Sequence, residues 1–215
     1  MRNPRARPEL DQKQLDDDER HSQDWMVALE AFTRVPLDMG IQAGLEFPVG
    51  LRVSAGYGWV PGPYMDFFTD KLAGANSNAA VLLREGIQSG RTLRLQAGFR
   101  PWRELGFYAD AGFANISLDG SIEGEQLRGV NPGTYSATTS IDTWLLEIGY
   151  QAWVGRHFTL AAGLGLSGPL GSRSELSGDG LDPELAKSIA RAADEHVEQF
   201  GVLPALTLRL GFDMI

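Results

Sequence analysis

The sequence predicts an all-β protein, an eight-stranded antiparallel up-and-down barrel. Three observations predict it: apolar side chains alternate along eight segments, short and long connections alternate between them, and one face of every segment lacks charge. Successive side chains of a strand point to opposite faces of a sheet, so this period of two indicates strands. The predicted strands are 25–35, 39–47, 51–59, 92–100, 105–115, 142–153, 157–167 and 203–214.

The first three strands follow one another closely, through 36–38 and 48–50. Their apolar faces carry Trp25, Val27, Leu29, Ala31, Thr33 and Val35, then Met39, Ile41, Ala43, Leu45 and Phe47, then Leu51, Val53, Ala55, Tyr57 and Trp59. Pro61 and Pro63 end the third strand, because proline cannot donate a hydrogen bond to a sheet.

The remaining strands are joined alternately by short turns, at 101–104 and 154–156, and by longer connections, at 116–141 and 168–202. Their apolar faces carry Leu93, Leu95, Ala97 and Phe99; Leu105, Phe107, Ala109, Ala111 and Phe113; Trp144, Leu146, Ile148, Tyr150 and Ala152; Phe158, Leu160, Ala162, Leu164 and Leu166; and Leu206, Leu208, Leu210, Phe212 and Met214. One end of the barrel therefore has tight turns, and the other carries the loops, including 60–91.

The two faces predict which side of the barrel meets lipid. The forty apolar-face positions contain no charged residue, although 22% of the chain is charged. The opposite face is rich in glycine and holds five arginines and five carboxylates: Glu30, Arg34, Glu46, Arg52, Arg94, Arg100, Asp110, Glu147, Arg209 and Asp213. An eight-stranded barrel has room inside for few side chains, so glycine and ion pairs fit there and forty apolar groups do not. The sequence predicts a transmembrane barrel with a lumen plugged by ion pairs, among them Arg209 near Glu30.

Aromatic residues gather near both ends of the predicted strands, as the two membrane interfaces favour. Toward the short turns lie Phe47, Phe99, Phe107, Tyr150 and Phe158, and toward the loops lie Tyr57, Trp59, Phe113 and Trp144.

The eight alternating segments, the asymmetry of the connections and the terminal stretch "LPALTLRLGFDMI" resemble one family. They resemble the small eight-stranded outer-membrane β-barrels of Gram-negative bacteria, the class of the outer-membrane protein A transmembrane domain. The resemblance covers residues 24–215 and implies a bacterial outer membrane, periplasmic short turns and external loops. In that family the last strand usually ends in an aromatic residue that the assembly machinery reads, whereas here Asp213, Met214 and Ile215 follow Phe212. No peptidoglycan-binding domain follows the barrel, so that function is not expected.

Composition sets further limits. The net charge of -9 argues against nucleic acid as a partner, and the absence of cysteine excludes disulfides and thiolate metal sites. No apolar run approaches the roughly 18 residues of a membrane helix. Residues 1–23 are charged and almost without apolar side chains, so we expect a flexible tail. They contain no secretory signal, which we expect to have been removed.

The external loops are the predicted binding surface. Residues 182–200 predict a helix capped by Asp182, with Pro183 in its first turn and Gly201 after its end. Its apolar stripe is Leu185, Ile189, Ala193, Val197 and Phe200, which we expect to pack across the barrel mouth or on loop 60–91. A second short helix is expected around Asn78 to Glu85. Besides lipid, a protein partner on loops 60–91 and 168–202 is therefore possible.

The sequence shows no cofactor or metal motif. The acidic stretches at 119–125 and 177–180 lack the twelve-residue calcium pattern, and turn chemistry accounts for both. The histidines, His21, His157 and His196, have no metal-ligand spacing. Some barrels of this class modify lipids with a serine, a histidine and an acid, and Ser167, His196 and Glu195 are the candidates here.

The favoured function is structural: anchoring, envelope integrity or loop-mediated binding. The alternatives are a narrow channel for ions or small solutes and a lipid-modifying enzyme. The rival fold is a soluble ligand-binding barrel with its apolar face inward.

Overall fold

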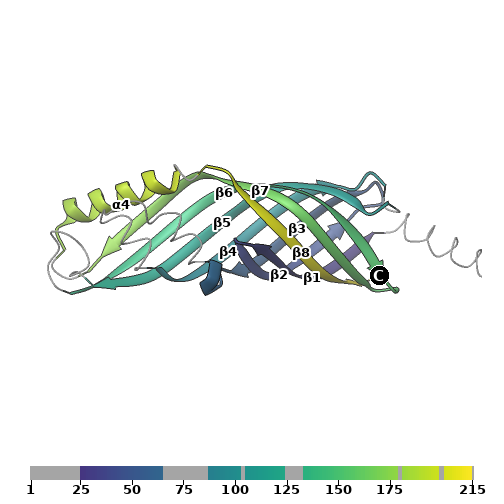
Figure 1. Cartoon of the computed structure of the whole chain (residues 1–215), viewed down its shortest axis with the longest axis horizontal. Coiled ribbons are helices and arrows are strands. Elements are labelled where there is room, and N and C mark those ends of the chain that lie inside the picture. The colour runs from purple at the N-terminus through teal and green to yellow at the C-terminus, as the bar shows by residue number, and fades with distance from the viewer. Residues whose placement is uncertain are drawn as a thin grey trace, which may run out of the picture.

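Eight strands form a closed antiparallel barrel in the computed structural model, with consecutive strands as neighbours and β8 paired to β1 (Figure 1). The structure describes residues 25–64, 87–102, 105–123, 133–178, 181–198 and 201–214. The strands are β1 (Met26–Val35), β2 (Asp38–Glu46), β3 (Leu51–Trp59), β4 (Ile87–Phe99), β5 (Phe107–Glu123), β6 (Thr134–Val154), β7 (Phe158–Ser177) and β8 (Leu203–Met214). The predicted fold class and all eight strands are confirmed.

The barrel closes through a regular ladder between the first and last strands. Leu29 faces Phe212 and Thr33 faces Leu208 in this register. Closure leaves no unpaired edge in the membrane-spanning part, where unpaired backbone groups could not be satisfied by water.

The apolar face points outward. Ile148 and Leu164 are each 66% exposed, whereas the adjacent Glu147 is only 5% exposed. The rival prediction of a soluble barrel with an apolar interior is therefore wrong. Its error has a simple physical cause, since the arginines and carboxylates fill the interior and the large apolar groups have no room there.

β5, β6 and β7 continue furthest beyond the point where β3 and β8 end (Figure 1). The pairing of β5 with β6 extends to Glu123 and Thr134, and that of β6 with β7 extends to Ser136 and Ser177. The predicted loops at 116–141 and 168–202 are thus partly wrong, because much of each is strand. The acidic stretch at 119–125 begins on β5, and Asp119 and Glu123 are strand residues rather than turn residues.

The exterior of this extension is polar, which marks the edge of the apolar belt. Phe113 and Trp144 face each other on the outer surface, and the next outward pair along the strands is Asn115 and Asp142. Beyond this level the outward side chains of β5 and β6 are serine, threonine and acidic residues: Ser117, Asp119, Ser121, Glu123, Thr134, Ser136, Thr138 and Ser140. Water therefore bathes the outer face of the extension.

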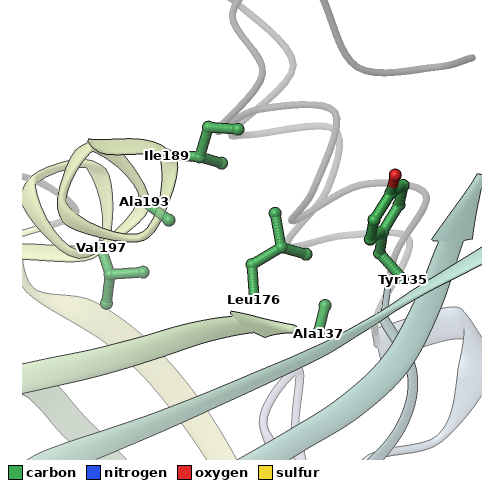
Figure 2. Packing of buried hydrophobic residues seen from close by; sticks show 6 residues of the cluster. All are labelled: Tyr135, Ala137, Leu176, Ile189, Ala193 and Val197. Atoms are coloured by element: carbon green, nitrogen blue, oxygen red, sulfur yellow. The ribbon is translucent and has the colours of Figure 1, made fainter. Parts of the chain in front are cut away.

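The helix α4 (Pro183–Glu198) packs on the luminal face of the extension. Figure 2 shows Ile189, Ala193 and Val197 directed toward Leu176 of β7 and Ala137 of β6. The predicted stripe is therefore used, but its partner is the extension of β6 and β7. Loop 60–91 lies largely outside the described residues, as does Phe200.

The N-terminal end of α4 follows the sequence prediction, and residues 199–200, at its predicted C-terminal end, lie outside the described residues. The carboxylate of Asp182 accepts hydrogen bonds from the backbone N–H groups of Glu184, at 2.8 Å, and Leu185, at 3.3 Å. This is the bonding of an N-cap residue, which satisfies donors that lack a partner inside the helix. Gly201 has a φ of +68°, a left-handed conformation that favours glycine after a helix.

Several predictions fall on residues that the structure does not describe: the tail 1–23 with His21, and the second helix around Asn78 to Glu85. In the described part of the chain, no helix is long and apolar enough to cross a membrane.

Candidate functional site

The lumen of the barrel is the candidate site, because the charged residues of the membrane-spanning strands converge there. Each of the ten predicted lumen residues is at most 8% exposed: Glu30, Arg34, Glu46, Arg52, Arg94, Arg100, Asp110, Glu147, Arg209 and Asp213. Buried charges are costly unless they are paired and hydrogen-bonded, so their partners decide what the lumen can do.

Arg209 on β8 is the centre of the network. Its Nη2 lies 2.6 Å from Glu147 Oε1 and 3.2 Å from Asp110 Oδ2, and its Nη1 lies 3.7 Å from Glu30 Oε2. One guanidinium thus links carboxylates from β1, β5 and β6 across the lumen. The predicted proximity of Arg209 and Glu30 is present in the structure.

Glu147 is fixed from two further sides. Tyr108 donates its hydroxyl to Oε1 at 2.8 Å, and Thr207 donates its hydroxyl to Oε2 at 2.7 Å. The guanidinium carbons of Arg52 and Arg209 lie 4.8 and 4.5 Å from the centre of the Tyr108 ring. Cation–π contacts of this kind strengthen when they are shielded from water. The carboxylate is therefore held in one position by charge and by hydrogen bonds.

Glycine makes room for this cluster. A Cβ added to Gly163 would lie 2.7 Å from the Tyr108 hydroxyl and 2.9 Å from Glu147 Oε1. A Cβ on Gly149 would overlap the Tyr108 hydroxyl. The phenol can lie across β6 and β7 because Gly149 and Gly163 have no side chains there.

A second chain of contacts runs through Arg94. Its Nη2 donates to the side-chain oxygen of Gln42, whose amide nitrogen donates to Glu30. The guanidinium carbon also lies 3.5 Å from the centre of the Phe32 ring. Gln42 therefore relays an interaction between Arg94 and the acid that also faces Arg209.

Near the short turns, another layer of charge closes the barrel. Arg100 Nη2 lies 3.2 Å from Glu46 Oε2 and donates to the side-chain oxygen of Gln151. Trp153 Nε1 donates to Asp213 Oδ2 at 3.1 Å. Arg52 Nε lies 3.4 Å from Asp110 Oδ1, which connects this layer to the central one.

At the loop end, Arg34 forms two hydrogen bonds to Asp38. Nε donates to Oδ1 at 2.7 Å and Nη2 donates to Oδ2 at 3.0 Å. Sequence reasoning missed Asp38 because it assigned residues 36–38 to a turn. Its spacing from Arg34 around a very short connection is the signal that could have revealed the pair.

Two small separate cavities lie in the lumen among the residues that the structure describes. A cavity of about 20 Å³ lies toward the short turns, lined by Glu46, Arg100 and Asp213, and one of about 10 Å³ lies toward the loops, lined by Arg34, Gln96 and Ser167. Each volume suits about one water molecule. The Arg209 cluster lies between them.

The predicted girdle residues lie on the outside. Seven are exposed, namely Tyr57, Trp59, Phe99, Phe107, Phe113, Tyr150 and Phe158, and two, Phe47 and Trp144, are partly exposed. Near the short turns the rings contact one another, with 5.4 Å between the centroids of Phe107 and Tyr150.

The described residues do not assemble a hydrolytic site. Ser167 is 4% exposed on the luminal face of β7, whereas Glu195 is exposed on α4. The His196 side chain lies outside the described residues, and the exposed His157 stacks on Phe212 with 5.6 Å between ring centroids. Among described residues, no group of three histidine or acidic side chains is placed to hold a metal ion.

Comparison with known proteins points to a fold rather than to a close relative. No protein-family model and no curated protein matches the chain. Among solved structures, a major outer membrane protein from Thermus thermophilus matches with a TM-score of 0.52 and 15% identity, covering 88% of this chain and 98% of that one. The N-terminal β-barrel domain of Pseudomonas aeruginosa OprF matches with a TM-score of 0.45 and 14% identity, covering 89% of this chain and 98% of that one. By its closed eight-stranded meander, its apolar exterior and its likeness to the Thermus thermophilus protein, the chain has the fold of the small eight-stranded outer-membrane β-barrels.

Proposed function

We propose that the protein is a structural barrel of the outer membrane with a plugged lumen, which anchors an external platform for binding. The observation that carries the proposal is the Arg209 cluster, where one guanidinium meets Glu30, Asp110 and Glu147. The platform consists of the extension of β5–β7 and α4.

The plug follows from the cost of breaking the cluster. An ion that crosses the lumen must pass the level of Arg209, where the side chains of four strands touch. Separating the cluster leaves charges buried without partners, which costs several kcal/mol. The cavities on either side hold too little water to replace the lost contacts. We therefore expect the lumen to be closed at rest.

Planar-bilayer recording tests the plug. Pure folded protein should insert without producing a steady conductance. A reproducible steady conductance from the same preparation would refute the plug and support the narrow channel.

One observation keeps the channel as the second candidate. Arg94 Nε and Nη1 are buried and have no hydrogen-bond partner among the described residues. Unsatisfied donors in a polar lumen attract water, so a rearrangement around Arg94 is the most direct way to open a wet path. In that case Arg94→Met should change the single-channel conductance, whereas under the plug neither protein conducts.

Anchoring and loop-mediated binding can be separated from each other. We expect a strain without the protein to become more sensitive to detergent, and the wild-type chain to restore resistance. If the barrel alone supports the envelope, a variant with α4 released by Ile189→Asp should also restore it. If α4 carries the function, that variant should fail while still folding in the membrane.

We propose no catalytic activity. Four of the luminal carboxylates, Glu30, Glu46, Asp110 and Glu147, have arginine partners, and a carboxylate beside a cation is poorly suited to acid–base chemistry. The check is incubation with membrane lipids and mass analysis. A change in lipid mass that disappears with His196→Ala would contradict this proposal.

A further inference from the structure

A groove interrupts the outer wall at the upper edge of the apolar belt. It has a volume of about 380 Å³ and is lined by Phe113, Ala114, Asp142, Thr143, Leu170 and Gly171. This volume is within the range of small-molecule sites. Phe113, Asp142 and Leu170 of this lining are exposed on the outer surface, and none of the six lining residues belongs to the Arg209 cluster.

A β-bulge in β7 forms the groove. Asp142 pairs with Gly171 and Thr143 pairs with Pro169, so Leu170 has no partner on β6 and is 59% exposed. Pro169 has no N–H to donate to the ladder. On the other side of β6, Thr143 Oγ1 donates to the Ala114 carbonyl of β5 at 3.1 Å.

The groove spans the boundary between lipid and water. Its lower part is continuous with the belt through Phe113, which is 65% exposed. Its upper part contains Asp142, whose Oδ1 accepts a hydrogen bond from Asn115 Nδ2 at 2.8 Å. Within the part of the chain that the structure describes, Asp142 has no ion-pair partner. An apolar surface below a fixed carboxylate suits an amphiphile with its chain down and its head up.

The surface above the groove indicates the kind of head. The outward side chains of the extension include four carboxylates, Asp119, Glu123, Asp142 and Glu175, and one arginine, Arg173, while Arg91 lies beside the extension on β4. Arg91 is already paired with Asp119 at 2.8 Å. An anionic head would be repelled here, whereas a neutral head with many hydroxyls would find carboxylate, amide and hydroxyl partners.

We propose that this groove binds a membrane glycolipid, with an acyl chain against Phe113 and Leu170 and a sugar hydroxyl donating to Asp142. The site is held open by the bulge and by Gly171, where an added Cβ would meet no atom within 4 Å. Gly171→Leu can therefore fill the groove without displacing the wall.

The test is native mass spectrometry of the protein released from phosphatidylcholine nanodiscs that contain a minor amount of monoglucosyl-diacylglycerol or of phosphatidylglycerol. Wild-type protein should retain the glucolipid in preference to both phospholipids. Gly171→Leu should reduce the retained glucolipid roughly tenfold, and Asp142→Ala should remove most of the preference for the sugar head.

Two matched variants serve as controls. At Gly62 an added Cβ also meets no atom within 4 Å, and Glu123 is an acid at the far end of β5. Gly62→Leu and Glu123→Ala should bind glucolipid like the wild type. All variants should show the heat-dependent gel shift of a folded barrel.

Three results would overturn the proposal: equal retention of all lipids by wild type, preference for phosphatidylglycerol, or undiminished glucolipid on folded Gly171→Leu. A conductance measured in planar bilayers would leave it intact, because the groove does not depend on the plug.

Discussion

Arg209 is the side chain whose loss should disturb the lumen most. Its guanidinium lies within 3.7 Å of Glu30, Asp110 and Glu147, and it is 2% exposed. Arg209→Ala leaves these carboxylates close together without their shared cation, so we expect unfolding to become easier by about 3–5 kcal/mol. Urea titration of the protein in lipid vesicles, followed by tryptophan fluorescence, measures the change.

An exposed ion pair on the same barrel is the control. Arg91 lies 2.8 Å from Asp119, and the two side chains are 61% and 37% exposed. Arg91→Ala should cost less than about 1 kcal/mol, because water screens both charges. Equal effects of the two substitutions would mean that the Arg209 cluster does not stabilise the barrel.

Two glycines on β2 test how tightly the wall is built. A Cβ on Gly40 would overlap the Tyr57 carbonyl oxygen and lie 2.5 Å from Gly58 Cα, whereas a Cβ on Gly44 would be 3.9 Å from the Val53 carbonyl oxygen. Gly40→Ala should therefore destabilise the barrel by about 1–3 kcal/mol through overpacking, and Gly44→Ala should be nearly neutral. The same urea titration compares them. A neutral Gly40→Ala would show that β2 and β3 can separate at little cost.

At the scale of elements, α4 is held by a small apolar cluster. Ile189 is 4% exposed and Ala193 is fully buried, against Leu176 and Tyr135. Ile189→Asp places an unpaired charge in this contact, so α4 should detach while the barrel stays folded. Hydrogen exchange should become fast in residues 183–198 and remain slow in β1–β8.

Lys187 provides the matched control for that substitution, since its side chain is 75% exposed on the same helix. Lys187→Asp should leave exchange in α4 close to that of the wild type, apart from the small loss of its pair with Glu184. If both variants exchange alike, the luminal contact does not hold the helix.

The strands were predictable as far as lipid surrounds them. Between Trp25 and Trp59, and again from Leu206 to Met214, the apolar alternation marks each strand to within one residue or so of its observed end. Beyond Asn115 the apolar positions of β5 change face, because Ile116, Leu118 and Ile122 alternate with polar outward residues, so a reading that follows the outward apolar phase of the membrane segment stops there. The bulge at Leu170 also shifts the inward phase of β7, from Ser167 to Ser174, so a single period cannot describe the strand.

The sequence predicts which charged residues lie in the lumen, but it does not predict most of the pairs that they form. A face with arginines and acids must lie inside a barrel whose exterior meets lipid, which selects the ten luminal residues. Which luminal side chains pair depends on their relative heights along the barrel axis. These heights are set by the register and tilt of the strands, which the alternation of the sequence does not give. Tyr108 and Thr207 therefore join Glu147 without a sequence signal, and the stripe of α4 predicts a partner surface but not which one.

The whole molecule is organised by the contrast between its two environments. Charges that would be costly in lipid occupy the lumen, and the apolar side chains that usually form a core cover the outside. A conventional apolar cluster appears only where α4 covers the extension, among the residues that the structure describes (Figure 2). Apolar side chains thus face outward along the membrane-spanning strands, and they face inward, under α4, in the extension.

Two separate single substitutions to arginine test this organisation, one within the apolar belt and one on the polar extension. Leu208 is 45% exposed and pairs with Ala162, midway along the outward positions of β7 between Phe158 and Leu166. Leu208→Arg should destabilise the barrel by about 2–4 kcal/mol, because a charge at the centre of the bilayer is poorly solvated. Ser136→Arg lies on the polar extension and should change the free energy of unfolding by less than about 0.5 kcal/mol, as surface substitutions usually do. Both values come from reversible urea unfolding in vesicles. Equal costs at Leu208 and Ser136 would mean that the belt does not lie in the membrane.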